Sequence, residues 1–282
     1  MGNDRHDTAH QPVEKEYADG IWSWFLAGDK DGLPVRIRRA WAVKQRLHRL
    51  LPAVRRCILC EAPLSGAGAV ITGRLFGVRR SALTLDLCNR CEETILNAEG
   101  GAKVELSILF AHIRASSKVQ RMSPAEHKKF LQRFYEASSE ALIRHHALVN
   151  RLVGDHVIGL FVPRLAGANP TKAAIEAAFE VLKATGHEDK DGPWAPTGIG
   201  VHTEAAYVGA VGLKDGVKDV TVLGDAANLA LRLSASAGKG EVLISDEAAH
   251  SANIVYDLEK RKLQLKGIIG LVHVSVVKVE PE

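Results

Sequence analysis

The stretch Thr221-Val-Leu-Gly-Asp-Ala-Ala-Asn-Leu-Ala-Leu-Arg-Leu233 is the most informative segment of this chain. It places Asn228 and Arg232 four residues apart in an expected helix, so both side chains leave the same face. An amide and a permanently charged guanidinium on one face can orient a ribose and hold the negative charge that develops in phosphoryl transfer. The stretch therefore predicts a helix over 225–235 that carries part of a phosphoryl-transfer site.

The sequence on either side of this helix alternates between strand and helix patterns. Ser123-Pro-Ala-Glu126 has the residues of a capping box and opens an amphipathic helix that runs towards His145. A second such helix is expected over 170–186, and a hairpin is expected with Gly154 and Asp155 at its turn. The strands are expected at 104–113, 149–152, 157–162, 198–203, 206–212 and 240–245, with two more near the end. This alternation predicts an α/β layer architecture.

Taken in order, these motifs resemble the class III nucleotidyl cyclases over roughly residues 105–278. These are the catalytic domains that make cyclic AMP or cyclic GMP. The resemblance implies a ferredoxin-like fold and an active site in the cleft between two domains paired head to tail, as a homodimer or as a heterodimer with another cyclase domain. It also implies two divalent metal ions, Mg²⁺ or Mn²⁺, which activate the ribose 3′-hydroxyl and clamp the phosphates.

The resemblance assigns roles position by position. Asp155, in Leu-Val-Gly-Asp, matches the metal ligand of the hairpin, and Asn228 and Arg232 match the residues that orient the ribose and stabilise the transition-state phosphate. The two purine-binding positions fall on Arg151 and Thr221. A cation that reaches adenine N1 and a hydroxyl that reaches the 6-amino group favour ATP, although an arginine also suits guanine O6 and leaves GTP open.

The metal positions depart from the family pattern. The aspartate of the first strand falls on His112, where the family has Phe-Ala-Asp-Ile, and the Asp-Glu of the hairpin tip is Asp155-His156. An imidazole supplies one nitrogen and no charge; Mg²⁺ prefers oxygen, Mn²⁺ tolerates nitrogen better and Zn²⁺ prefers it. His112 is therefore either part of an altered metal site or a polar residue at a strand end without a ligand role.

Two functional hypotheses follow from this departure. The first is an adenylate cyclase of intracellular signalling that converts ATP to cyclic AMP and pyrophosphate, weakly or with Mn²⁺, because a metal aspartate is missing. The second is an inactive cyclase-like domain that binds nucleotide or lends the Asn228 and Arg232 half of the site to an intact partner.

The four cysteines form two Cys-x-x-Cys pairs, Cys57 with Cys60 and Cys88 with Cys91. Four thiolates can close a tetrahedral shell around a structural zinc ion, which leaves no open position for a substrate. An iron–sulfur cluster and metal-free or redox-active thiols are the alternatives. Residues 61–87 between the pairs are glycine-rich, which favours an expanded hairpin.

Composition divides the 282 residues into three regions. We expect a flexible or helical segment over 1–34, a basic helix with the four-cysteine module over 35–98, and the cyclase-like domain over 103–282. The helix that begins at Val35 is expected either to pack its apolar stripe on the neighbouring module or to bind an anionic membrane or a partner.

The remaining expectations come from charge and hydropathy. The net charge of +4 is too small to indicate a nucleic-acid partner, although the basic residues beside the cysteines leave a nucleic-acid-binding zinc ribbon as a minor alternative. No signal peptide and no apolar run of the length of a membrane span is visible. Cysteines in metal-binding spacing suit a reducing compartment, so the expected location is the cytoplasm.

Overall fold

The computed structural model of the chain describes residues 10–81, 84–114, 119, 121–212, 218–254 and 258–279; the side chains of 10–15 and 150–153 lie outside this description. Two compact units are present. The first comprises residues 1–104 and 207–222, and the second comprises residues 105–206 and 223–282. None of the described helices combines the length and the apolarity that a membrane span requires.

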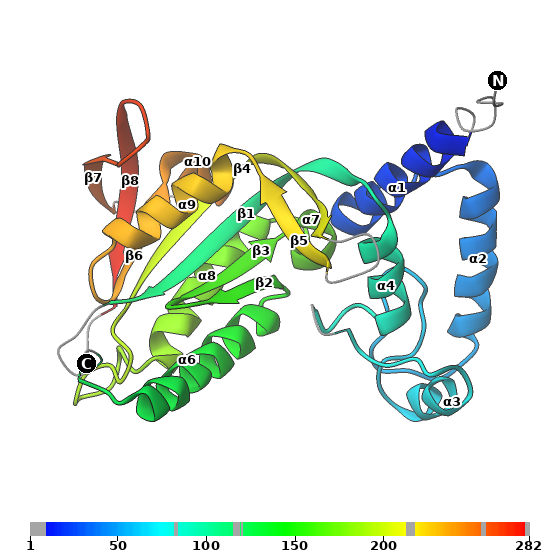
Figure 1. Ribbon diagram of the computed structural model, residues 1–282, viewed down its shortest axis with the longest axis horizontal. Coiled ribbons are helices and arrows are strands. Elements are labelled where there is room, and N and C mark those ends of the chain that lie inside the picture. Colours follow the sequence, from blue (N-terminus) through cyan, green and yellow to red (C-terminus); the bar gives the residue numbers. More distant parts are fainter. Residues whose placement is uncertain are drawn as a thin grey trace, which may run out of the picture. The chain divides into compact units, whose positions relative to one another are not determined.

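The second unit contains the predicted ferredoxin-like arrangement (Figure 1). Its strands and main helices follow the order β1 (Gly101–Ile113), α6 (Pro124–Arg144), β2 (Leu148–Val153), β3 (His156–Phe161), α8 (Pro170–Ala184) and β4 (Thr197–Gly212). The strands lie in the order β2-β3-β1-β4, with β3 antiparallel to both β1 and β2. This is the βαββαβ topology of that fold, as the sequence predicts.

Three further strands extend the sheet beyond β4. These are β6 (Glu241–Ser245), which is parallel to β4, then β8 (Leu271–Lys278) and β7 (Glu259–Gln264), which are antiparallel. The short strand β5 (Lys218–Leu223) pairs with β4 outside this order. The sequence predicted two strands over 198–212; the structure has one continuous strand, whose first seven residues are all buried.

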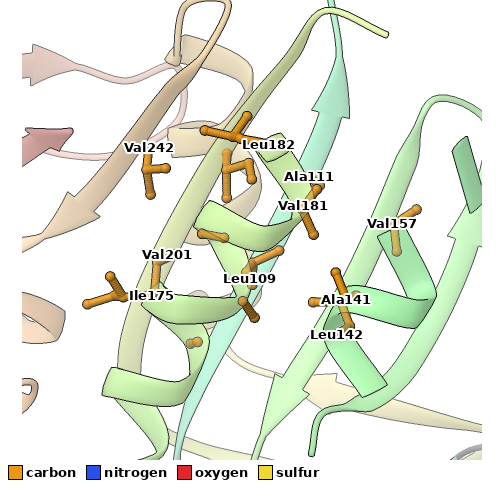
Figure 2. Close-up of a cluster of buried hydrophobic side chains, with 14 of the residues drawn as sticks. Leu109, Ala111, Ala141, Leu142, Val157, Ile175, Val181, Leu182, Val201 and Val242 are labelled. Atoms are coloured by element: carbon orange, nitrogen blue, oxygen red, sulfur yellow. The ribbon is translucent and has the colours of Figure 1, made fainter. Parts of the chain in front are cut away.

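Helices α6 and α8 enclose the main hydrophobic core with one face of the sheet (Figure 2). Leu142 of α6 and Val181 of α8 are fully buried together with Val201 of β4. The predicted capping box at the start of α6 is confirmed, since the Ser123 hydroxyl accepts from the Glu126 amide and the Glu126 carboxylate accepts from the Ser123 amide. The short helices α7 (Pro163–Ala166) and α10 (Asp246–Ser251) also belong to this unit.

Helix α9 (Asp225–Ser236) packs on the opposite face of the sheet. Side chains alternate across a strand, so Val242 of β6 joins the main core while Leu243 joins a second cluster with Leu233 of α9. Gly200 allows this approach: a Cβ atom there would lie 2.5 Å from the Ala230 carbonyl oxygen. The backbone of β4 and the backbone of α9 are therefore in direct contact.

The first unit contains α1 (His10–Ala27), α2 (Val35–Arg49), α3 (Ala67–Phe76) and α4 (Asn89–Asn97). Trp22 of α1 is fully buried, and its indole nitrogen donates to the Ala98 carbonyl oxygen at 3.2 Å, which joins α1 to the end of α4. The sequence predicted an expanded hairpin between the cysteine pairs, and this prediction is wrong, because helix α3 lies there. Gly66 and Gly77, which suggested turns, lie at its two ends with positive φ angles of 83° and 63°.

Helix α2 forms where the sequence predicted it, but its apolar stripe is not packed. Gln45 donates to the Leu59 carbonyl oxygen and His48 to the Cys60 carbonyl oxygen, both at 2.6 Å, so the polar face of the helix lies on the cysteine turn. Of the stripe residues, Ile37 is half-buried and Ala40 is exposed, and three are 57–80% exposed: Val43, Leu47 and Leu50. The expectation that the stripe packs on the neighbouring module is therefore wrong, because hydrogen bonds to the cysteine turn orient the helix.

Candidate active site

The turn of the β2–β3 hairpin brings Asp155 to the end of β1. Gly154 takes a positive φ of 61°, and the Ile113 amide donates to the Asp155 carbonyl oxygen at 3.0 Å. His112 of β1 lies directly opposite His156 of β3 in the strand register. The fold therefore places the two metal positions predicted from the sequence, His112 and Asp155, next to each other.

Both imidazoles face the Asp155 carboxylate. His112 Nε2 lies 2.9 Å from Asp155 Oδ2, and His156 Nδ1 lies 2.6 Å from Asp155 Oδ1. The two rings stack with centroids 4.0 Å apart and planes 10° apart. The Asp155 side chain is 53% exposed, whereas His112 and His156 are 18% and 23% exposed. The carboxylate thus accepts a hydrogen bond from His112, lies close to His156 and still faces solvent.

The electrostatics of this cluster favour a neutral His112. Burial and the neighbouring His156 hold the pKa of His112 below its ordinary value, and these effects outweigh the hydrogen bond to Asp155. Burial raises the pKa of Asp155, but the hydrogen bond from His112 and the charges of both imidazoles hold it below its ordinary value. A deprotonated carboxylate beside a neutral imidazole is the state in which both groups can bind a metal ion.

The second part of the predicted site lies on α9. Asn228 and Arg232 are exposed and lie one helical turn apart, as the spacing predicts. The guanidinium of Arg114 donates to the Ala235 carbonyl oxygen at 2.9 Å and to the Ser234 carbonyl oxygen. Arg114 therefore satisfies the carbonyl groups at the end of α9 and holds the helix against the end of β1.

The comparisons with known proteins identify the family and the fold. Residues 100–274 match the adenylate and guanylate cyclase catalytic domain family. The chain belongs to this family. An uncharacterised protein of Mycobacterium tuberculosis is 30% identical over 157 residues, which are 55% of this chain and 29% of that protein. An adenylate cyclase of Mycobacterium bovis is 26% identical over 189 residues, which are 66% of this chain and 42% of that protein.

The structural comparison shows the cyclase fold. The crystal structure of the guanylyl cyclase Cya2 superimposes with a TM-score of 0.57 at 21% identity, covering 64% of this chain and 94% of that one. The chain thus contains nearly all of a cyclase domain, but it spans less than half the length of the two mycobacterial relatives.

The two positions that the sequence predicts to bind the purine lie in β2 and β5. Arg151 lies in β2 with its Cα opposite Ile158 of β3, and its side chain is outside the described residues. Thr221 is half-buried in β5, in the first unit, whereas Asn228 and Arg232 belong to the second unit.

The donor set does not fit the pair of Mg²⁺ ions that the family resemblance implies. Asp155 is the carboxylate of this cluster, and the other two donors are imidazole nitrogens. Mg²⁺ takes oxygen ligands in octahedral geometry and binds imidazole poorly. Sequence reasoning identified His112 and noted the change at 156, but it missed that His156 joins the same cluster. No local signal in the sequence indicates this, because only the pairing of β1 with β3 places His156 opposite His112.

The four cysteines of the first unit lie together, as their spacing predicts. All four are buried, and each sulfur atom lies within 4.8 Å of the others. Cys60 and Cys88 have sulfur atoms 3.7 Å apart, far from the roughly 2 Å of a disulfide and close to the ~3.8 Å edge of a tetrahedral metal–thiolate site. Hydrogen bonds with Cys57 and Cys60 hold the pKa of the Cys88 thiol below its ordinary value. The four sulfur atoms can bind one metal ion.

Proposed function

We propose that this chain is a nucleotidyl cyclase that converts ATP to cyclic AMP and pyrophosphate, weakly or with a preference for Mn²⁺, in a site shared between two cyclase domains. The observation that carries the proposal is the pair Asn228 and Arg232, exposed together on a helix that Gly200 and Arg114 hold against the sheet. A rigid support of this kind keeps two side chains aimed at one substrate.

In the reaction, the ribose 3′-oxygen forms a bond to the α-phosphorus while the bond from that phosphorus to the pyrophosphate oxygen breaks. Arg232 is proposed to donate to the α-phosphate oxygens, where negative charge is redistributed in the transition state. Asn228 is proposed to hold the ribose so that its 3′-oxygen faces the phosphorus. Arg151 and Thr221 are proposed to bind the purine, and the Thr221 hydroxyl favours the 6-amino group of adenine over the oxygen of guanine.

Metal preference follows from the donor set. Imidazole nitrogen is accepted by Mn²⁺ and poorly by Mg²⁺, so we propose higher turnover with Mn²⁺. At the four cysteines we propose a structural Zn²⁺, because four buried sulfur atoms at tetrahedral spacing leave no position for a substrate. Buried reduced thiols of this kind persist in a reducing compartment, so we propose that the chain acts in the cytoplasm in cyclic-nucleotide signalling.

The difference between the α9 side and the metal side of the site favours a second candidate function. The α9 side retains both residues of the family pattern, whereas the metal side has two imidazoles and one carboxylate. In this alternative the chain supplies Asn228 and Arg232 to an intact partner domain that supplies both aspartates, and the chain alone does not turn over.

The test measures cyclic AMP and cyclic GMP made by the purified chain from ATP and GTP, with Mg²⁺ and with Mn²⁺. We expect cyclic AMP with Mn²⁺, a loss of about 10²–10³-fold in Arg232→Ala, and a gain with Mg²⁺ in His112→Asp. Ser236→Ala, an exposed change at the end of α9, is the matched control.

A mixture of variants separates the two candidate functions. Asp155→Asn and Arg232→Ala each damage one side of a shared site, so mixing the two inactive proteins is expected to restore part of the activity if the chain pairs with itself. A wild-type chain that makes no product with either metal contradicts the first proposal and supports the second.

A further inference from the structure

The cluster of His112, Asp155 and His156 combines three donors that bind transition metals. Each residue offers one ligand atom, and these atoms lie within 4.8 Å of one another. Two imidazoles and one carboxylate form a three-ligand set that Zn²⁺ and other first-row ions take in proteins, with further positions open to water or substrate. We propose that this cluster binds one transition-metal ion of the Zn²⁺ class in place of two Mg²⁺ ions.

The spacing of the donors supports this assignment. Metal–ligand bonds of about 2.0–2.1 Å in a tetrahedral site place the ligand atoms about 3.3 Å apart. His112 Nε2 and His156 Nδ1 lie 2.9 and 2.6 Å from the two Asp155 oxygens, and the two ring planes are 10° apart. To admit one ion, the carboxylate must therefore withdraw and the stacked rings must turn so that both nitrogens face it. The hairpin holds the three residues in place, because the Ile113 amide bonds to the Asp155 carbonyl oxygen and Tyr135 donates to the Gly154 carbonyl oxygen.

A purely structural role explains the cluster less well. His112 Nδ1 is buried, and no hydrogen-bond partner for it exists among the described residues. A cation bound to His112 Nε2, His156 Nδ1 and an Asp155 oxygen would join all three side chains directly.

The open side of the cluster indicates what the ion would bind. Asp155 is 53% exposed, so solvent or a substrate oxygen can reach the ion beside it. A Zn²⁺-class ion with open positions takes a phosphate oxygen of a nucleotide. This inference concerns the same site as the proposed cyclase activity, but metal binding itself does not depend on turnover.

The test is metal stoichiometry in the full chain. Wild-type protein is dialysed against a small excess of Zn²⁺ in the presence of millimolar Mg²⁺, and its zinc content is measured. We expect two zinc ions per chain, one at the cysteines and one at the histidine cluster. His112→Asn, His156→Asn and Asp155→Asn are each expected to retain one, because removal of a direct ligand weakens binding by more than the roughly hundredfold that loss of an outer contact costs.

A matched control is His145→Asn. His145 also has carboxylate partners, with its Nε2 2.7 Å from Glu180 and its Nδ1 3.9 Å from Glu176, but no second imidazole is grouped with it among the described residues. This variant is expected to keep both zinc ions. Far-ultraviolet circular dichroism of each variant checks that it is folded.

Cobalt absorption provides a readout that separates the two sites. Protein with Zn²⁺ at the cysteines is titrated with Co²⁺, and a visible band without thiolate charge-transfer absorption is expected in wild type and His145→Asn but not in His156→Asn. One zinc ion in wild type, or equal zinc content in wild type and His156→Asn, overturns the proposal. An absence of cyclic nucleotide together with two bound zinc ions overturns only the proposed function.

Discussion

The two clusters of metal-binding side chains differ in how completely the protein encloses them. Cys57, Cys60, Cys88 and Cys91 are each at most 1% exposed. In the other cluster, the Asp155 side chain is 53% exposed and the two imidazoles are half-buried. A metal ion bound by four thiolates has no position left for a substrate, so it can only stabilise the surrounding fold. An ion bound by three donors can still take a further ligand. The comparison predicts that damage to the first cluster affects folding and that damage around the second affects chemistry.

The largest effect is expected at the closed cluster. Cys88→Ser removes one ligand of the proposed zinc but not the cap of α4, because a serine hydroxyl can accept from the Cys91 amide as the Cys88 sulfur does. Structural zinc contributes an apparent binding free energy of about 10–16 kcal/mol to small domains, so loss of the ion is expected to unfold the cysteine turns. Hydrogen exchange is expected to rise by several orders of magnitude over α3 and α4, while β3 and α8 stay protected.

Chelation of the wild-type protein provides the control for this prediction. A strong zinc chelator is expected to produce the same exchange pattern as Cys88→Ser, and His112→Asn is expected to leave α3 and α4 protected. Unchanged protection of α4 in Cys88→Ser contradicts a structural role for the metal.

The next largest effect is expected at Gly200, where strand β4 supports the helix α9 that carries Asn228 and Arg232. Gly200→Ala places a Cβ atom 2.5 Å from the Ala230 carbonyl oxygen, so β4 and α9 must move apart. Overpacking of this kind costs about 1–3 kcal/mol of unfolding free energy. Because α9 carries Asn228 and Arg232, we also expect cyclase activity to fall further than stability alone explains. Urea unfolding and initial rates under fully folded conditions measure the two effects.

A glycine in the other unit is the matched control. Gly73 lies inside α3, where a Cβ atom would have only an ordinary 3.4 Å contact with the Val78 carbonyl oxygen. Gly73→Ala is expected to stabilise its helix by about 0.5–1 kcal/mol, since alanine loses less conformational freedom. If both substitutions destabilise equally, close backbone packing is not what distinguishes Gly200.

The sequence predicted the elements of the cyclase domain because their local signals agree with the tertiary fold. The Ser123 capping box, the Gly154 turn and the spacing of Asn228 and Arg232 are all short-range features. The first unit was harder to predict. Gly66, Gly73 and Gly77 suggested turns, but two of them cap a helix and the third lies within it.

Tertiary contacts explain the remaining differences between the structure predicted from the sequence and the structure observed. The apolar stripe of α2 predicted its buried face, yet hydrogen bonds from Gln45 and His48 to the cysteine turn fix the opposite orientation. The role of His156 required the strand register, because only the pairing of β1 with β3 places it opposite His112. Neither contact is encoded in a local pattern, since both join residues distant in sequence.

The smallest effect is expected at the loop that follows α9. Glu241 accepts from the Gly238 amide at 2.7 Å and from both terminal nitrogens of Arg261 at 3.1 Å. The hydrogen bonds from Arg261 are the main reason that the pKa of Glu241 lies below its ordinary value. A carboxylate with a lowered pKa in the folded state stabilises the protein above its unfolded pKa of about 4.3 and loses this contribution as the pH falls through the folded value.

Glu241→Gln is therefore expected to lower the free energy of unfolding by about 1–2 kcal/mol at pH 7, and the difference from wild type is expected to shrink below about pH 4. Urea unfolding of both proteins between pH 7 and pH 3.5 measures it. Glu259→Gln is the control, because Glu259 also bonds to Arg261 but its side chain is 49% exposed, so its effect is expected to be smaller at every pH. A loss in Glu241→Gln that is independent of pH would mean that the shape of the side chain, and not its charge, holds the loop.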